Sequence, residues 1–214
     1  MGKSIYIATF VATLAIVLVL LFSVKLAEDS KASQFNEEIR QFALENELQS
    51  AYADFDTNNR DVYCAVVNQG IESLSKSAGV LEKQLETYKE NSFNSQEFFL
   101  VKRNYLITNM VLYSSFLKAK SYCDLNTKAV IFFYAEDKSC SVDCGVIGSQ
   151  LEELSRDCKS FRAFNFPYQW PSYEFTKILE VKYGINNPGT VVVDGNVFEM
   201  PVKFDDFSKK LGCS

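Results

Sequence analysis

The chain has 214 residues, a net charge of −5 and an apolar fraction of 47%. That fraction, with 18 Phe and 11 Tyr, excludes a disordered protein and is enough to build a core. The acidic balance, without any cluster of Lys and Arg, argues against nucleic acid as a partner. Because the chain contains no histidine, it can build neither a Ser-His-Asp triad nor an imidazole metal site, so its six cysteines are its main chemical resource.

Residues 5–24 form a continuous apolar stretch, IYIATFVATLAIVLVLLFSV, without charge or proline. A helix of that length spans about 30 Å, the thickness of the hydrocarbon core of a bilayer. We therefore predict a transmembrane helix that binds membrane lipid, preceded by a short cytoplasmic tail at residues 1–4. A cleaved signal peptide is the alternative, although its apolar region is usually shorter. Lysines flank the stretch on both sides, so charge alone does not set its orientation.

Two further helical segments follow a polar linker at residues 25–60. The linker has apolar positions at the spacing of a juxtamembrane helix. Residues 61–125 then show apolar positions that alternate steps of three and four, on both sides of a break at residues 91–95, which predicts an antiparallel helical hairpin. These positions are Phe35, Ile39, Phe42 and Leu48 in the linker; Cys64, Val67, Ile71, Leu74, Ala78, Leu81, Leu85 and Tyr88 in the first hairpin helix; and Phe98, Val101, Tyr105, Leu112, Phe116 and Ala119 in the second.

Cys64 and Cys123 are equally far from the middle of the hairpin loop. Antiparallel helices therefore place both sulfurs at the open end of the hairpin, within reach of a disulfide. Such a bond closes a loop of roughly 60 residues and stabilises the fold by about 4 kcal/mol in the chain-entropy model. Two buried free thiols that pack as small apolar side chains are the alternative. A disulfide requires an oxidising compartment, so we expect a single-pass protein of the plasma (inner) membrane with its C-terminal domain outside the cytoplasm.

Residues 126–214 change to alternating strands and helices. An apolar run at its start predicts a central strand buried on both faces. The order that follows predicts an α/β domain with a mixed β-sheet flanked by helices. The predicted segments are a strand at 128–134, a helix from about 141 to 156, a strand at 161–166, a helix from Ser172 to Tyr183 ended by Gly184, a β-hairpin at 190–200 with an Asp194-Gly195 turn, and a helix at 205–211.

This order resembles the thioredoxin fold over residues 128–213. The resemblance is carried by the strand Val130–Tyr134 that leads into Cys140-Ser-Val-Asp-Cys144 at a helix start, by Tyr183-Gly-Ile185 and by Pro188-Gly-Thr-Val-Val-Val-Asp-Gly195. In that family a cis-proline before the hairpin strand faces the redox cysteines, and Pro188 is the candidate here, with Gly189 between it and the strand. The family motif is Cys-x-x-Cys, whereas this chain has Cys-x-x-x-Cys. Thioredoxin-like copper chaperones share that longer spacing but use a histidine ligand, which this chain lacks.

The resemblance implies catalytic roles for the cysteine pair. Cys140 lies at the predicted helix cap, the more exposed position, and would be the attacking thiol, with Cys144 one turn later as the resolving thiol. A helix N-terminus lowers the pKa of a thiol, while nearby carboxylates oppose a thiolate, so we expect any couple here to be reducing. A redox-inert disulfide and free or metal-bound thiols are the alternatives. The carboxylates are Glu136, Asp137 and Asp143, offset by Lys138.

In a thioredoxin-like domain the Cys-containing helix and the last helix share one face of the sheet. Cys158 and Cys213, at the ends of these helices, are therefore expected to form a third disulfide, with an unpaired Cys213 as the alternative. Trp170 lies near the expected active-site edge, either as a packed loop anchor or as a partner-contacting aromatic. The carboxylates of Glu152 and Glu153 are expected to be solvated on a helix surface.

Two functions are compatible with these expectations. The first is a membrane-anchored thiol–disulfide oxidoreductase that acts on protein thiols and disulfides without a cofactor. The second is a redox-inert thioredoxin-like interaction or scaffold module, whose disulfides are all structural and whose helical hairpin is the docking surface. The sequence does not set the oligomeric state.

Overall fold

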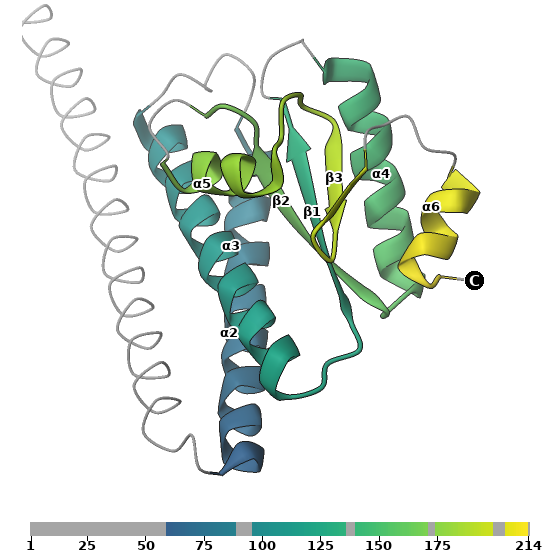
Figure 1. Cartoon of the computed structure of the whole chain (residues 1–214). Coiled ribbons are helices and arrows are strands. Elements are labelled where there is room, and N and C mark those ends of the chain that lie inside the picture. Colours follow the sequence, from purple (N-terminus) through teal and green to yellow (C-terminus); the bar gives the residue numbers. More distant parts are fainter. Residues whose placement is uncertain (1–58, 89–95, 136–139, 171–173, 199–203, 214) are drawn as a thin grey trace, which may run out of the picture. The chain divides into compact units, whose positions relative to one another are not determined.

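The computed structural model describes residues 59–88, 96–135, 140–170, 174–198 and 204–213 (Figure 1). The predicted transmembrane helix, the linker helix and the hairpin loop lie outside these residues. Within the described part of the chain, no helix is both long enough and apolar enough to span a bilayer.

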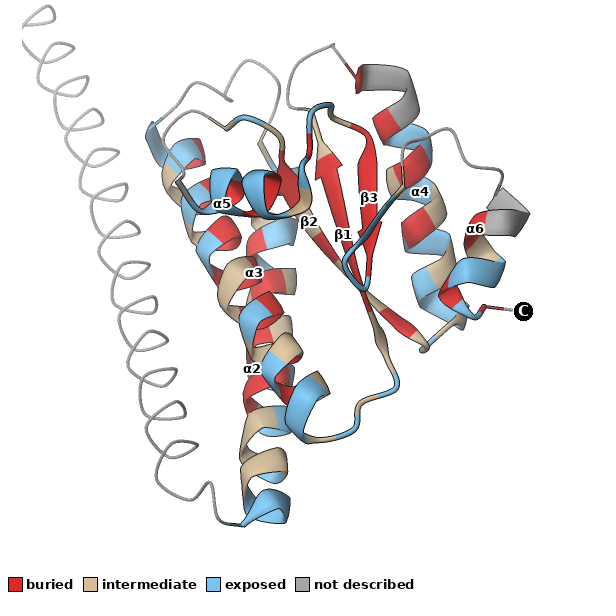
Figure 2. Cartoon of the chain, viewed as in Figure 1, coloured by how far each residue is buried: buried red, intermediate tan, exposed pale blue. Residues whose placement is uncertain are grey.

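The predicted helical hairpin is confirmed by two long neighbouring helices, α2 (Arg60–Glu86) and α3 (Gln96–Tyr122). Helix α2 begins at an N-cap residue, Asn59, whose side chain accepts a hydrogen bond from the backbone N–H of Val62. The apolar positions of both helices face each other and the sheet, which leaves their outer faces exposed (Figure 2). Apolar spacing therefore predicted which side of each helix is buried.

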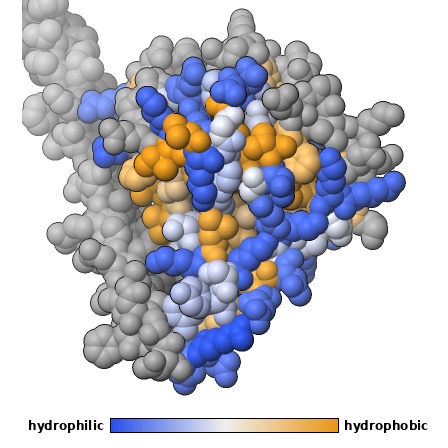
Figure 3. Space-filling view, viewed as in Figure 1, coloured by the Kyte–Doolittle hydropathy of each residue, from blue (hydrophilic) through white to orange (hydrophobic). Residues whose placement is uncertain are grey.

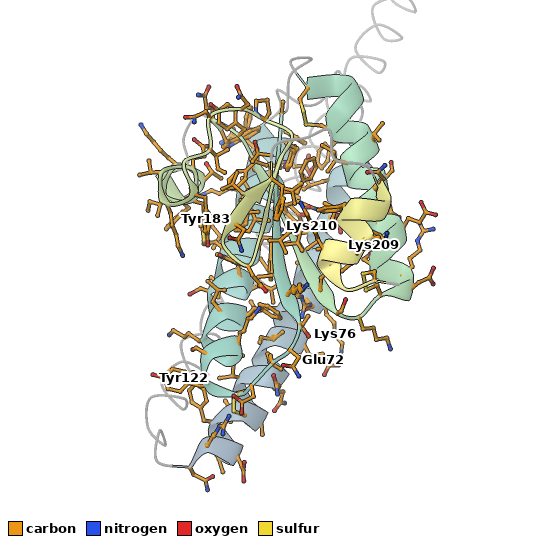
Figure 4. The ribbon with its side chains drawn as sticks, turned by 45° about the vertical axis from the view of Figure 1, so that its right-hand side comes forward. Glu72, Lys76, Tyr122, Tyr183, Lys209 and Lys210 are labelled. Carbon is orange, nitrogen blue, oxygen red and sulfur yellow. A yellow bond between two sulfur atoms is a disulfide. The ribbon has the colours of Figure 1, made fainter. Side chains whose placement is uncertain are left out.

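A disulfide between Cys64 and Cys123 joins the two helices at the open end of the hairpin, where their Cα atoms are 5.6 Å apart. This pairing was predicted from the symmetry of the hairpin and is confirmed. Figure 4 marks Tyr122 at this end of α3, where its backbone carbonyl accepts a hydrogen bond of 2.7 Å from Nε of Arg60. Arg60 also forms an ion pair with Asp124, so the end of the hairpin is held by polar contacts as well as by the disulfide.

The other described residues form a four-stranded mixed sheet, as predicted for an α/β domain. The sheet order is β2-β1-β3-β4, with β1 parallel to β2 and with antiparallel pairs β1–β3 and β3–β4. Parallel neighbours need a crossover connection, which α4 (Ser141–Asp157) provides. The strands are β1 (Lys128–Tyr134), β2 (Phe161–Pro167), β3 (Thr190–Val193) and β4 (Asn196–Phe198).

The turn between β3 and β4 confirms the predicted Asp-Gly hairpin. Asp194 and Gly195 have φ angles of 47° and 85°, both positive, as a two-residue type I′ turn requires. The side chain of Asp194 also accepts a hydrogen bond from the backbone N–H of Ala129 and forms an ion pair with Lys120. The turn thereby ties the sheet to α3.

Helices cover the sheet on two sides (Figure 1). Helix α4 and the last helix, α6 (Phe204–Leu211), pack on one face, where Val130 and Phe132 of β1 meet Ile147 and Leu151 of α4. On the other side lie the hairpin and α5 (Glu174–Tyr183). Ring contacts of 5.1 and 5.7 Å join Phe164 of β2 to α3; they are made with Tyr113 and Phe116.

The predicted disulfide between Cys158 and Cys213 is confirmed, with Cα atoms 5.6 Å apart. It joins the end of α4 to the residue that follows α6, and Ser160 reinforces the junction by donating a hydrogen bond of 2.9 Å to the carbonyl of Leu211. The expectation that these two helices share one face of the sheet is borne out by their common apolar core.

Candidate functional site

The third disulfide, Cys140–Cys144, lies at the N-terminus of α4 and is the candidate site. Cys140 is the N-cap residue of α4, with φ −132° and ψ 18°, and Cys144 lies one turn into the helix. One helical turn brings residues four positions apart to the same side, so their Cα atoms are 5.4 Å apart and the sulfurs bond. All six cysteines are therefore paired, and free thiols are excluded in this state.

Three elements meet at the edge of the sheet that holds this disulfide: the carboxyl end of β1, the start of α4 and the turn before β3 (Figure 1). The turn is fixed by a hydrogen bond of 2.7 Å, which the backbone N–H of Gly189 donates to the carbonyl of Phe133. Gly189 has φ +82°, and a Cβ atom built on it would lie 3.2 Å from Sγ of Cys140. The sulfur of Cys140 therefore contacts bare backbone, where any side chain would be crowded.

The expectation that Cys140 is the more exposed of the two cysteines is wrong. Cys140 is 8% exposed and Cys144 is 9% exposed, so both are buried to the same degree. Gly189 lies against the sulfur of Cys140, and Cys140 belongs to the same buried apolar core as Ile147, which explains its burial. Cys144 belongs to the same apolar core.

Pro188, the predicted proline of the site, lies in the turn before β3 and is half-buried. The residue placed against the sulfur of Cys140 is its neighbour, Gly189. Sequence reasoning passed over Gly189 because it looked for a proline, although a glycine immediately before a strand is a usual sign of a positive φ angle. A catalytic role for Pro188 stays a prediction.

An aromatic cluster with a buried cation lies beside the end of β1. The ammonium of Lys102, on α3, lies 5.0 Å from the ring centroid of Tyr134 and 5.8 Å from that of Trp170. Trp170 is half-buried and its ring lies 5.8 Å from that of Phe99, which favours the packed anchor over the partner-contacting aromatic. Lys102 itself is 8% exposed and was missed by sequence reasoning.

Lys102 is one of the charged groups that act on the Glu82 carboxyl of α2. Loss of hydration, followed by the carboxylates of Glu86 and Glu152, raises the pKa of the Glu82 carboxyl, and Lys102 opposes this shift. Glu82 lies on α2, Lys102 on α3 and Glu152 on α4, so charged groups of three helices act on the Glu82 carboxyl.

The side chains of Glu136, Asp137, Lys138 and Asp143 lie outside the described part of the structure, whereas Glu152 and Glu153 have the expected surface role. Glu152 and Glu153 are exposed, and Glu152 forms an ion pair of 2.6 Å with Arg156 one turn later. Among the residues that the structure describes, no group of three or more metal-ligating side chains is close enough to hold a metal ion.

The chemistry available at the site is that of a disulfide, which accepts two electrons and two protons to become a dithiol. The N-terminus of α4 favours negative charge on the sulfur at its cap. A search of protein-family models, curated proteins and solved structures finds no match to this chain.

Proposed function

We propose that the protein is a membrane-anchored thioredoxin-like thiol–disulfide oxidoreductase that acts on protein substrates outside the cytoplasm. The observation that carries this proposal is the Cys140–Cys144 disulfide at the start of α4, with Gly189 against the sulfur of Cys140. The order of elements from β1 to α6 supports the resemblance to thioredoxin-like proteins. In that family the redox cysteines lie where the central strand leads into a helix.

The three disulfides differ in how much they stabilise the fold. The Cys64–Cys123 and Cys158–Cys213 bonds join residues 59 and 55 positions apart, whereas Cys140 and Cys144 are four positions apart. In the chain-entropy model the two long loops each contribute about 4 kcal/mol and the short one about 2 kcal/mol. The Cys140–Cys144 bond is therefore the one whose reduction costs the fold least, as a bond that opens and closes in each turnover requires.

The proposed reaction is a two-step exchange. The thiolate of reduced Cys140 attacks one sulfur of a substrate disulfide, so that a mixed disulfide forms and the other substrate sulfur leaves as a thiolate. The thiolate of Cys144 then attacks Sγ of Cys140, which breaks the mixed disulfide and releases the second substrate thiolate. Two electrons pass from the dithiol to the substrate, and the two protons that the dithiol loses end on the two substrate thiols. The reverse sequence oxidises a substrate dithiol.

The proposed location follows from two features of the chain. Residues 5–24 are uncharged over the length that a bilayer core requires, and we propose that they anchor the protein. All six cysteines are bonded, and such a set persists in compartments that keep thiols oxidised. Both features support a C-terminal domain on the extracytoplasmic side.

A second function is favoured by burial. Both cysteines of the short disulfide are buried, as in a bond that is never turned over. Helix α5 also presents an exposed apolar stripe, on the face of the molecule where apolar and charged side chains alternate (Figure 3). An interaction module with structural disulfides would use such exposed apolar surface rather than its sulfurs. The stripe consists of Phe175, Ile178 and Val181, which are 50%, 58% and 75% exposed.

Redox titration of the full chain in detergent separates the two functions. The Cys140–Cys144 pair is equilibrated with dithiothreitol buffers and its thiols are counted by alkylation and peptide mass spectrometry, while exchange is measured on a disulfide-bonded model protein. An oxidoreductase loses exchange on Cys140→Ser and keeps it on the matched control, Cys64→Ser with Cys123→Ser. A potential below about −300 mV without any exchange would establish the inert module instead.

A further inference from the structure

Helix α5 has one face fixed to the rest of the domain and one face exposed. On the inner face, Leu179 is 4% exposed and Glu180 is 9% exposed. The carboxylate of Glu180 accepts a hydrogen bond of 2.7 Å from the backbone N–H of Gln169. The hydroxyl of Tyr183 is hydrogen-bonded to that of Tyr113 on α3. These contacts fix the rotation of α5 about its own axis, so its outer face stays exposed.

The outer face of α5 carries the exposed apolar stripe formed by Phe175, Ile178 and Val181. At 3.6 residues per turn, this stripe covers about 120° of the helix surface. An exposed lysine lies at each border of it. Lys177 is one turn before Val181, and Lys182 is one turn after Ile178. Lysines that border an apolar stripe are typical of a helix that lies in a membrane interface, because their stems follow the apolar surface while their ammonium groups reach the lipid headgroups.

The exposed charge beside the stripe is positive, although the whole chain carries −5. Between residues 175 and 190 the charged residues are Lys177, Glu180 and Lys182, and of these Glu180 is buried. The ammonium of Lys182 also lies 5.0 Å from the ring centroid of Tyr183, and the residue is still exposed. Glu174 begins the helix, and its side chain lies outside the described part of the structure.

This positive charge favours an anionic surface over a second copy of the chain as the partner of the stripe. Anionic lipid attracts a lysine near its surface and strengthens binding about fivefold for each lysine. Two copies that met through their stripes would instead bring four lysines together, and like charges across an interface are unfavourable.

The proposed anchor would keep the domain near a bilayer. Residues 25–59 span at most about 125 Å even when fully extended, so contact between the domain and the lipid is an intramolecular event for an anchored chain. A small contact surface is then sufficient, because the cost of bringing two separate partners together does not arise.

We propose that the outer face of α5 docks on an anionic bilayer surface, with the apolar stripe against the boundary of the acyl chains and with Lys177 and Lys182 at the headgroup phosphates. This inference rests on the membrane anchor of the proposed function and is independent of its redox chemistry.

The test uses the full chain in vesicles of phosphatidylcholine with brominated acyl chains, prepared with or without phosphatidylserine. Bromine quenches the fluorescence of a tryptophan that it contacts, so Val181→Trp reports whether the stripe meets the lipid. The unmodified chain gives the signal of Trp170 alone. Val146→Trp is the matched control, since Val146 is 51% exposed on α4, which packs on the opposite face of the sheet (Figure 1). We expect quenching at position 181, and none at position 146, when phosphatidylserine is present.

Replacing both lysines tests the electrostatic part. In the Val181→Trp chain, Lys177→Gln with Lys182→Gln should lower the ratio of docked to undocked molecules about 25-fold, and omission of phosphatidylserine should have a similar effect. All these positions are exposed, so circular dichroism should be unchanged. Quenching that is independent of phosphatidylserine and of the lysines would overturn the assignment to an anionic surface. A Val181→Trp chain quenched no more than the unmodified chain would overturn docking itself.

Two other results have separate readouts. If the stripe binds a second copy, light scattering in detergent shows a dimer that Ile178→Ser dissociates, and position 181 is unquenched in vesicles; this outcome overturns the proposal. If high salt removes the chain from the vesicles, residues 5–24 are not an anchor. Quenching at low salt then still decides whether α5 contacts the lipid, so failure of the anchor and failure of docking are distinguishable.

Discussion

Removing the disulfides one at a time tests whether Cys140–Cys144 is a structural bond. Two matched double variants replace a cysteine pair by alanine: one at Cys64 and Cys123, the other at Cys140 and Cys144. Each removes two sulfur atoms and one bond, but the loops that the bonds close differ, with sequence separations of 59 and 4. The chain-entropy model gives a loss in the free energy of unfolding of about 4 kcal/mol for the first variant and about 2 kcal/mol for the second.

The single tryptophan of the chain provides the assay. Trp170 packs between Phe99 and Lys102 of α3, so its fluorescence reports whether the hairpin remains docked on the sheet domain. Urea unfolding of the full chain in detergent, followed by this signal and by far-ultraviolet circular dichroism, gives the midpoint for each variant. With a slope of about 2 kcal/mol per molar urea, the midpoints should fall by about 2 M and about 1 M.

Equal losses for the two variants, or a larger loss for Cys140 and Cys144, would refute this reasoning. The short disulfide would then hold native structure that loop entropy does not describe, as a structural bond in an inert module does. If the dependence of the free energy of unfolding on urea concentration changes in one variant only, the denatured state has changed. The two bonds are then compared by reducing each of them in the unmodified chain.

Two further substitutions test the packing around the site and the hairpin, each against a matched control. Gly189→Ala forces a side chain onto a residue with φ +82° and against a sulfur, so we expect a loss of about 1–2 kcal/mol in urea unfolding and slower reduction by dithiothreitol. The control, Gly79→Ala, lies in a helix with nothing within 4 Å of the added atom, and it should raise the free energy of unfolding by about 0.5–1 kcal/mol. A loss of stability at Gly79 as large as that at Gly189 would contradict the steric explanation. Tyr113→Phe removes the hydroxyl contact with Tyr183 of α5 and should lower the free energy of unfolding by about 1 kcal/mol (Figure 4). The control, Tyr122→Phe at a residue that is 64% exposed, should lower it by less than about 0.5 kcal/mol. If Tyr113→Phe left the free energy of unfolding unchanged, the contact would not hold α5 in place.

The elements and the disulfide pairs were predictable because they follow from short-range rules. Apolar spacing predicted the buried faces of α2 and α3, and turn chemistry predicted the hairpin at Asp194-Gly195. The symmetry of the hairpin loop was enough to pair Cys64 with Cys123. The pairing of Cys158 with Cys213 needed the additional expectation, taken from a resemblance, that two helices lie on one face of the sheet.

The surroundings of the candidate site were less predictable because they depend on contacts between distant elements. The burial of Cys140 arises from the turn before β3, and no local pattern at Cys140 shows that Gly189 will cover it. Lys102 is different, since a signal for it was present. It lies four residues after Phe98 and three before Tyr105, on the apolar side of a predicted helix, where a buried ammonium needs compensating contacts. A charged residue on the predicted apolar face of a helix therefore marks a position where compensating contacts are expected, even before the fold is known.

The N-cap of α4 bears on whether its disulfide has a purely structural purpose. A helix start usually carries Ser, Thr, Asp or Asn, whose side chain accepts a backbone N–H and contributes about 1 kcal/mol. Cys140 occupies that position and makes no such side-chain hydrogen bond. The disulfide adds about 2 kcal/mol in the chain-entropy model, so its gain over an ordinary cap is about 1 kcal/mol, far less than that of either long-range bond. A cysteine pair in place of an ordinary cap therefore adds little stability to the fold, which supports the proposed thiol–disulfide exchange at this position.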